Sequence, residues 1–293
     1  MVKMKIFVSV CAALFILMNV DKSDGQESKS APPKAVNIIV ILDTSNRVSK
    51  TKHPGQVERD KEIVRSIVDL FHQLVVDHFE TLKLGDTIKH PHRLTFVVPD
   101  QPRVPSIPQS IMKKLTIENQ RGGMDTFIKQ KETLLEGIDE LYQFVQQQNQ
   151  FTGADIWNWF RADAAYYFKD DANNRLVCLS DGYLNFDEDI EEKFPKGRYM
   201  EVSKLRDNPK WTQKFQGLLP IKKDFSPYNA KFLMVEITLQ SDLKTGVIYT
   251  QDFEIIEKYW NTWLNSMGIV ETKFIEQLNP DILKTTIKSF ILR

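Results

Sequence analysis

The sequence has few cysteines and no excess of charge of either sign. Its two cysteines are Cys11 and Cys178. Because Cys11 lies in an apolar N-terminal segment that we expect to be removed, Cys178 is alone in the mature chain, and an intramolecular disulfide is excluded there. The 39 basic and 39 acidic residues cancel. The overall charge therefore gives no attraction to nucleic acid or to anionic lipid.

Several sequence motifs of enzymes and membrane proteins are also missing. The 12 glycines form no Walker-type phosphate loop, no Gly-x-Gly-x-x-Gly fingerprint and no Gly-x-Ser-x-Gly nucleophile elbow. After residue 20, no apolar run is long enough to cross a membrane. We therefore expect a protein that is not an enzyme and that has no membrane span once its N-terminal segment is removed.

The N-terminus is typical of an export signal. Lys3 and Lys5 precede an apolar segment at residues 6–20, which is short for a membrane span. Ser23 and Gly25 are small residues at the positions that a signal peptidase reads. We predict cleavage after Gly25 and a secreted or periplasmic protein. The alternative is an N-terminal anchor that is not cleaved.

The predicted domain organisation follows from this signal. We assign residues 1–25 to the signal peptide and residues 26–35, which are polar and contain two prolines, to a linker. Residues 36–293 are then one domain. Within it, residues 183–229 contain Pro, Gly, Lys and Asp without a clear period, and we expect a long excursion with one or two short helices.

Strands and helices alternate along this domain. Residues 36–42 are almost continuously apolar, which is typical of a strand buried on both faces in a parallel sheet. We predict further strands at residues 92–98, 114–118, 174–180, 231–239 and 269–275, of which 114–118 is a candidate antiparallel edge. Apolar residues at helical spacing predict helices at residues 57–79, 134–145, 154–168, 253–267 and 280–292. The predicted fold class is α/β, with a doubly wound, mostly parallel sheet flanked by helices.

Acidic and hydroxyl side chains follow two of the predicted strands. Asp43 and Ser45 come directly after the first strand, and Asp181 follows the strand at residues 174–180. Thr152 precedes a predicted helix. Because the carboxyl ends of parallel strands meet at one edge of a sheet, we expect these side chains to converge there. Their oxygens are the ligands that Mg²⁺ prefers. The alternative is that they only cap helices and hold loops together.

This pattern resembles the von Willebrand factor A (vWA-like) family, whose domains occur in integrins and in many bacterial surface and secreted proteins. The metal-ion-dependent adhesion site of that family reads Asp-x-Ser-x-Ser, then a distant Thr, then an Asp in a Thr/Ser-Asp-Gly turn. Asp43 and Ser45 match its first part, Thr152 is the candidate for the Thr, and Asp181 matches the last Asp. The resemblance implies a secreted, bacterial-type protein in which Ser45 and Thr152 ligate the metal, while Asp43 and Asp181 hold waters and balance its charge.

The chain departs from the family pattern at Arg47, which stands where the motif has its second Ser. A guanidinium has no lone pair to donate to a metal. If Arg47 points inward, it can pair with Asp43 or Asp181 and take the place of the cation. If it points outward, a water can fill the missing position. We expect Mg²⁺ binding to be weak or absent.

The predicted function is binding of another protein. We expect the contact surface to be the loops that carry Asp43, Arg47, Thr152 and Asp181, and we call these loops, with Ser45, the rim. A second hypothesis is a hydrolase of phosphate or acyl esters with Asp43 or Ser45 as nucleophile. A third is a structural scaffold with no functional site.

Overall fold

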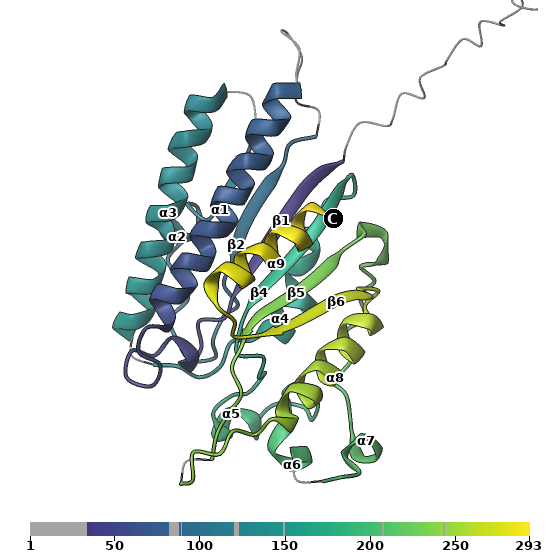
Figure 1. Ribbon diagram of the computed structural model, residues 1–293. Coiled ribbons are helices and arrows are strands. Elements are labelled where there is room, and N and C mark those ends of the chain that lie inside the picture. The colour runs from purple at the N-terminus through teal and green to yellow at the C-terminus, as the bar shows by residue number, and fades with distance from the viewer. Residues whose placement is uncertain are drawn as a thin grey trace, which may run out of the picture. The chain divides into compact units, whose positions relative to one another are not determined.

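Six strands form one sheet in the order β3-β2-β1-β4-β5-β6. The computed structural model describes residues 34–81, 88, 90–119, 123–148, 150–206, 208–242 and 244–293 (Figure 1). The strands are β1 (Ala35–Leu42), β2 (Arg93–Val97), β3 (Thr116–Glu118), β4 (Ala172–Leu179), β5 (Lys231–Ile237) and β6 (Glu271–Glu276). Neighbouring strands are parallel except β3, which pairs antiparallel with β2. The mostly parallel sheet and its antiparallel edge are as the sequence predicts.

Helices cover both faces of this sheet. The long helices are α1 (Gln56–Thr81), α3 (Gly123–Gln148), α8 (Gln251–Ser266) and α9 (Pro280–Leu292). The short ones are α2 (Gln109–Met112), α4 (Ile156–Ala162), α5 (Glu188–Glu191), α6 (Val202–Arg206) and α7 (Trp211–Lys214), with 3-10 turns η1 (Asn46–Val48), η2 (Ala164–Tyr166) and η3 (Ser226–Tyr228). In the part of the chain that the structure describes, no helix has the length and apolar character needed to span a membrane.

Alternate residues of the central strands belong to two separate cores. Ile38 and Val40 of β1 pack with α1, α3 and α9, whereas Ile39 and Ile41 pack with α4 and α8. A strand that is apolar at every position is therefore needed, because both of its faces are covered. The fold is a doubly wound α/β sheet, as predicted, and residues 34–293 form one compact unit. The predicted signal peptide and most of the predicted linker lie outside the described residues.

Two predicted helices have different bounds in the structure. The helix predicted at residues 134–145 begins at Gly123. The helix predicted at residues 154–168 is wrong as one element, because it consists of α4 followed by η2. Trp157 and Trp159 are both buried although they are two residues apart. A short helix buried on nearly all sides has no amphipathic stripe from which its length can be predicted.

The excursion at residues 183–229 contains α5, α6, α7 and η3, as predicted. It packs beside α8 through an ion pair between Arg206 and the fully buried Asp252, at 2.6 Å. Asp252 also accepts a hydrogen bond from the Tyr183 hydroxyl, at 2.5 Å. These contacts hold the start of the excursion close to the end of β4, which is the edge of the sheet where the acidic loops lie.

Candidate functional site

The carboxyl ends of β1 and β4 lie side by side at the centre of the sheet. Leu42 pairs with Leu179 in the parallel register of these strands, and the Asp43 amide donates to the Leu179 carbonyl at 3.1 Å. The strand order runs in opposite directions from this point, with β2 and β3 on one side and β5 and β6 on the other. Such a switch point is the usual ligand site of an open α/β sheet.

Asp43 is buried and firmly held at this switch point. It is 2% exposed. Its Oδ1 accepts from the Ser45 amide at 2.9 Å, and its Oδ2 accepts from the Ser180 hydroxyl at 2.7 Å. The Ser180 oxygen in turn accepts from the Gly182 amide at 3.1 Å. Asp43 therefore ties the loop after β1 to the loop after β4.

Asp181 is the second acid of the switch point, and it is only partly buried. Its Oδ1 accepts from the Tyr183 amide at 3.1 Å. Burial, together with the negative charge of Asp43, raises the pKa of Asp181 to about 7, although Arg47 acts in the opposite direction. Two carboxylates in one poorly solvated place repel each other, and a cation or a hydrogen-bond donor from a ligand relieves that repulsion.

Thr152 is connected to the same edge through Gln101. The Thr152 amide donates to Gln101 Oε1 at 3.1 Å, and Gln101 Nε2 donates to the Thr44 carbonyl at 2.7 Å. The Thr152 hydroxyl donates to the Pro102 carbonyl at 2.5 Å. The structure thus brings Asp43, Ser45 and Asp181 together directly and joins Thr152 to them by a buried amide.

Arg47 points inward, and its main partner is a residue that the sequence reasoning missed. Its guanidinium donates to both carboxylate oxygens of Asp60 in α1, at 2.7 and 2.8 Å, and to the main-chain carbonyl of Asp43 at 3.1 Å. Arg47 is 3% exposed and Asp60 is fully buried. Burial disfavours the charge of Arg47, but Asp60 outweighs it, so the pKa of Arg47 lies above its usual value.

Asp60 has further partners, which spread this polar cluster across the sheet edge. Tyr142 of α3 donates its hydroxyl to Asp60 at 3.0 Å, and Gln56 donates at 2.9 Å. Gln56 also reaches Glu236 at 3.4 Å, and Arg59 forms an ion pair with Glu236. Every acid named in this cluster has a donor, so Arg47 is committed to the cluster beneath the rim and is not needed to neutralise Asp181.

Glu236 is placed by an irregularity at the end of β5. It has a φ of 72°, which is a strained value for a residue with a side chain. The pairing of β5 with β6 shifts register between Met234 and Ile237, as at a β-bulge. The bulge turns the fully buried Glu236 side chain toward α1, where it meets Arg59.

One signal in the sequence could have identified Asp60. It lies on the apolar face of α1, at helical spacing from Val57, Ile63, Val64 and Ile67, all of which are buried. A charged residue on such a face needs a buried partner of opposite charge. Arg47 is a candidate from the preceding loop. The role of Ser180 carried no comparable signal, because its hydroxyl reaches Asp43 only through the strand register.

Comparison with known proteins adds no family to this picture. No protein-family model and no curated protein matches the chain.

Proposed function

We propose that residues 34–293 form a protein-binding module whose contact surface is the rim, with Asp181 as its accessible acid and with weak participation of Mg²⁺. The observation that carries this proposal is the convergence of Asp43 and Asp181 at the switch point, where Ser180 fixes Asp43 at 2.7 Å. A partly exposed carboxylate beside a buried one favours a ligand that brings positive charge or hydrogen-bond donors.

The resemblance to vWA-like domains supports this choice over catalysis. Asp43 and Ser45 stand in that family's motif, and the fold places their loop beside Asp181. The two oxygens of Asp43 accept from an amide and from a hydroxyl. Neither donor is a general base, so these contacts position Asp43 without activating it as a nucleophile.

The donor set at the rim fits a weakly held cation. Asp43, Asp181 and Ser45 offer hard oxygen atoms, and the guanidinium that replaces the motif's second serine is withdrawn toward Asp60. Among the described residues, no group of three or more His, Cys, Asp or Glu side chains is placed to hold a metal ion. Two acids and a hydroxyl give less negative charge than tight Mg²⁺ sites use, so water and a partner's oxygen would complete the coordination.

The export prediction is part of this proposal. A protein-binding module carried out of the cytoplasm by residues 1–25 would meet its partner in the periplasm or outside the cell. This follows from the sequence of the segment.

The cation part is tested by Mn²⁺ titration of the whole protein, followed by electron paramagnetic resonance, with Mg²⁺ as competitor. The variants are Asp181→Asn and, as a matched control, Asp170→Asn, an exposed acid outside the rim. We expect weak binding by the native protein that Asp170→Asn retains and Asp181→Asn loses. Equal binding by all three proteins contradicts a cation at the rim.

The protein-binding part is tested by cross-linking in the native cell extract with the same three proteins. We expect a partner that the native protein and Asp170→Asn capture in the same amount and that Asp181→Asn loses. A partner captured equally by all three contradicts the assignment of the rim. Turnover of generic phosphate or acyl esters that Asp43→Asn abolishes would instead support the hydrolase.

A further inference from the structure

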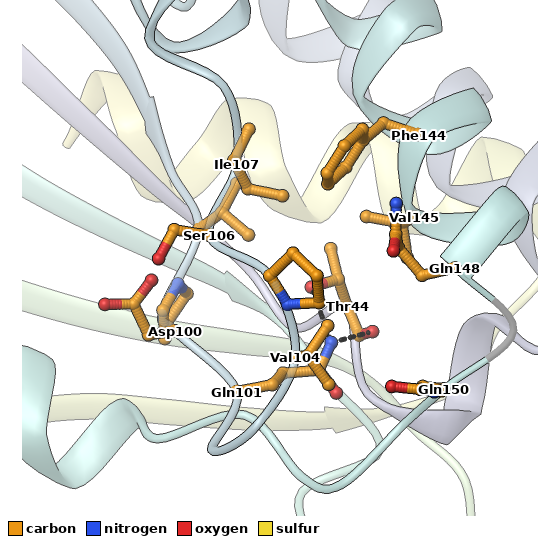
Figure 2. A pocket seen from close by; sticks show the side chains of 13 residues that line it. Thr44, Asp100, Gln101, Val104, Ser106, Ile107, Phe144, Val145, Gln148 and Gln150 are labelled. Atoms are coloured by element: carbon orange, nitrogen blue, oxygen red, sulfur yellow. Dashed lines mark hydrogen bonds between the residues drawn. The ribbon is translucent and has the colours of Figure 1, made fainter.

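A small hollow lies next to the rim, on the side of β2. It has an empty volume of about 330 Å³, including its open mouth. It lies between the Thr44 side of the rim, the loop after β2 and the end of α3 (Figure 2). Its lining residues are Thr44, Val98, Pro99, Asp100, Gln101, Val104, Pro105, Ser106, Ile107, Phe144, Val145, Gln148 and Gln150.

The walls of the hollow are fixed by contacts that need no ligand. Gln101 joins one wall to the rim through its bonds with Thr44 and Thr152. The Val104 amide closes a turn onto the Gln101 carbonyl at 3.2 Å, and Arg103 within this turn has a φ of 64°. The Arg103 guanidinium pairs with Asp189 of α5. A preformed hollow loses little entropy when it binds, which favours its use as a docking site.

The chemistry of the lining is apolar with one acid at the edge. Figure 2 shows Asp100 and Ser106 on one side and Phe144 and Val145 on the other. Among the described lining residues, the charged one is Asp100, which is exposed. The nearest arginine in the sequence, Arg103, is engaged by Asp189. An apolar hollow flanked by an acid without a basic lining residue complements an apolar group next to a cation.

We propose that this hollow anchors one aliphatic side chain of the partner protein and that Asp100 pairs with a lysine or arginine adjacent to it in the partner. The assignment rests on the proposed function, since it names the chemistry of the partner. It uses a different set of residues from the acids of the rim. Anchor residues in preformed pockets carry much of the energy of protein interfaces, and the rim alone offers no apolar contact of this kind.

The test uses the native protein labelled with ¹⁵N and three capped dipeptides, followed by amide chemical shifts. The probes are N-acetyl-leucyl-lysine amide, N-acetyl-leucyl-glutamate amide and N-acetyl-seryl-lysine amide. We expect saturable shifts at Val104, Ile107 and Phe144 with the leucyl-lysine probe, and weaker binding of the other two. Asp100→Asn should lower affinity for the leucyl-lysine probe by about two- to fivefold, because an exposed ion pair contributes little.

Val104→Phe is the variant that fills the hollow, and Val270→Phe is its matched control. Val270 is 70% exposed and precedes β6, at the opposite edge of the sheet. We expect Val104→Phe to weaken binding by about tenfold or more and Val270→Phe to leave it unchanged. Folding of both variants is checked by the dispersion of the same spectra.

Three results would overturn the assignment. They are no shifts at the hollow with the leucyl-lysine probe, equal binding of the glutamate probe, and equal binding of isobutanol, which would make the hollow a small-molecule site. None of these depends on Asp181 or on Mg²⁺. A failure here therefore leaves the rim proposal standing, and loss of the rim proposal through Asp181→Asn leaves the dipeptide result readable.

Discussion

Arg47 and Asp60 form a two-pronged ion pair inside the protein, with N–O distances of 2.7 and 2.8 Å. Arg47 stands in the loop after β1, and Asp60 lies one turn into α1. The pair explains how an arginine can occupy a position that a metal-binding motif gives to serine. The guanidinium serves the interior, and the carboxylates of the rim remain available.

The first prediction concerns the removal of this arginine. Arg47→Met leaves Asp60 buried without its charged partner, and we expect a loss of about 3–5 kcal/mol in the free energy of unfolding. The double variant Arg47→Met/Asp60→Leu should be more stable than the single one, because no uncompensated charge remains. Urea unfolding followed by circular dichroism measures both. Lys204→Met, which removes an exposed pair with Glu201, is the control and should leave the midpoint unchanged.

A single variant as stable as the native protein would contradict the buried pair. The same energetics complicate Arg47→Ser as a way to restore a complete metal motif. Its effect on metal binding has to be measured under conditions where the variant is shown to be folded.

The second prediction concerns the strained position at Glu236. Glu236→Ala removes the carboxylate that Arg59, Gln56 and Gln277 contact, and we expect a loss of about 2–4 kcal/mol. Glu236→Gly removes the same carboxylate but relieves the strain at a φ of 72°. It should therefore be about 1 kcal/mol more stable than Glu236→Ala. Urea denaturation of the two variants side by side gives this difference, and the reverse order would show that the bulge is not strained.

The third prediction compares two glycines with left-handed backbone. Gly153 has a φ of 102°, and a Cβ there would lie 2.2 Å from the Asn185 carbonyl oxygen; Gly246 has a φ of 69° and no neighbour within 4 Å. Gly246→Ala should cost only the backbone strain of about 1 kcal/mol. Gly153→Ala should cost about 1–3 kcal/mol more. Thermal unfolding of both variants tests this, and equal losses would show that residues 152–153 do not pack against residues 185–186.

The fourth prediction concerns the pH dependence that Asp181 imposes on stability. Its pKa of about 7 lies above the usual 3.8, so between these values the folded protein binds more protons at this group than the unfolded chain does. The contribution of Asp181 therefore falls as the pH rises from about 4 to about 7. We expect Asp181→Asn to be more stable than the native protein near pH 8, with the advantage fading toward pH 4.

This comparison has to be a difference between variants, because a histidine acts in the opposite direction. Burial, followed by the charge of His78, lowers the pKa of His92 to about 4 from 6.5, so the contribution of His92 is lost as the pH falls through this range. His92 is present in all the proteins and cancels in the difference. Asp170→Asn is the control, and a native-minus-Asp181→Asn difference that does not change with pH would contradict the raised pKa.

The parts of the fold that the sequence predicted best have a one-to-one relation between pattern and environment. The apolar run at residues 36–42 is β1, which begins one residue earlier, at Ala35. The helix predicted at residues 280–292 has the bounds of α9, with Pro280 in its first turn and the Asn279 side chain accepting from the Asp281 amide. Such signals are local, because they depend on the faces of one element and on its first turn.

The candidate site was predictable only in its positions. Strand order and parallel pairing place Asp43 beside Ser180, and any sequence with two acids after these two strands would bring them to one edge. Which side chain each residue meets was not predictable. Ser180 and Asp43 are 137 residues apart, and Arg47 had acids after β1, after β4 and within α1 to choose from.

The sequence by itself therefore determined the class of fold, the edge of the sheet where the acids gather and the residue that departs from the motif, because strand and helix periodicity record which faces are covered. Only the tertiary structure decided that Arg47 turns to Asp60 and that Glu236 is placed by a bulge. It also decided that a hollow opens between Thr44 and Phe144. Each of these depends on the distance and direction between side chains on different elements, which packing of α1, α3 and β5 against the sheet sets and which no local pattern encodes.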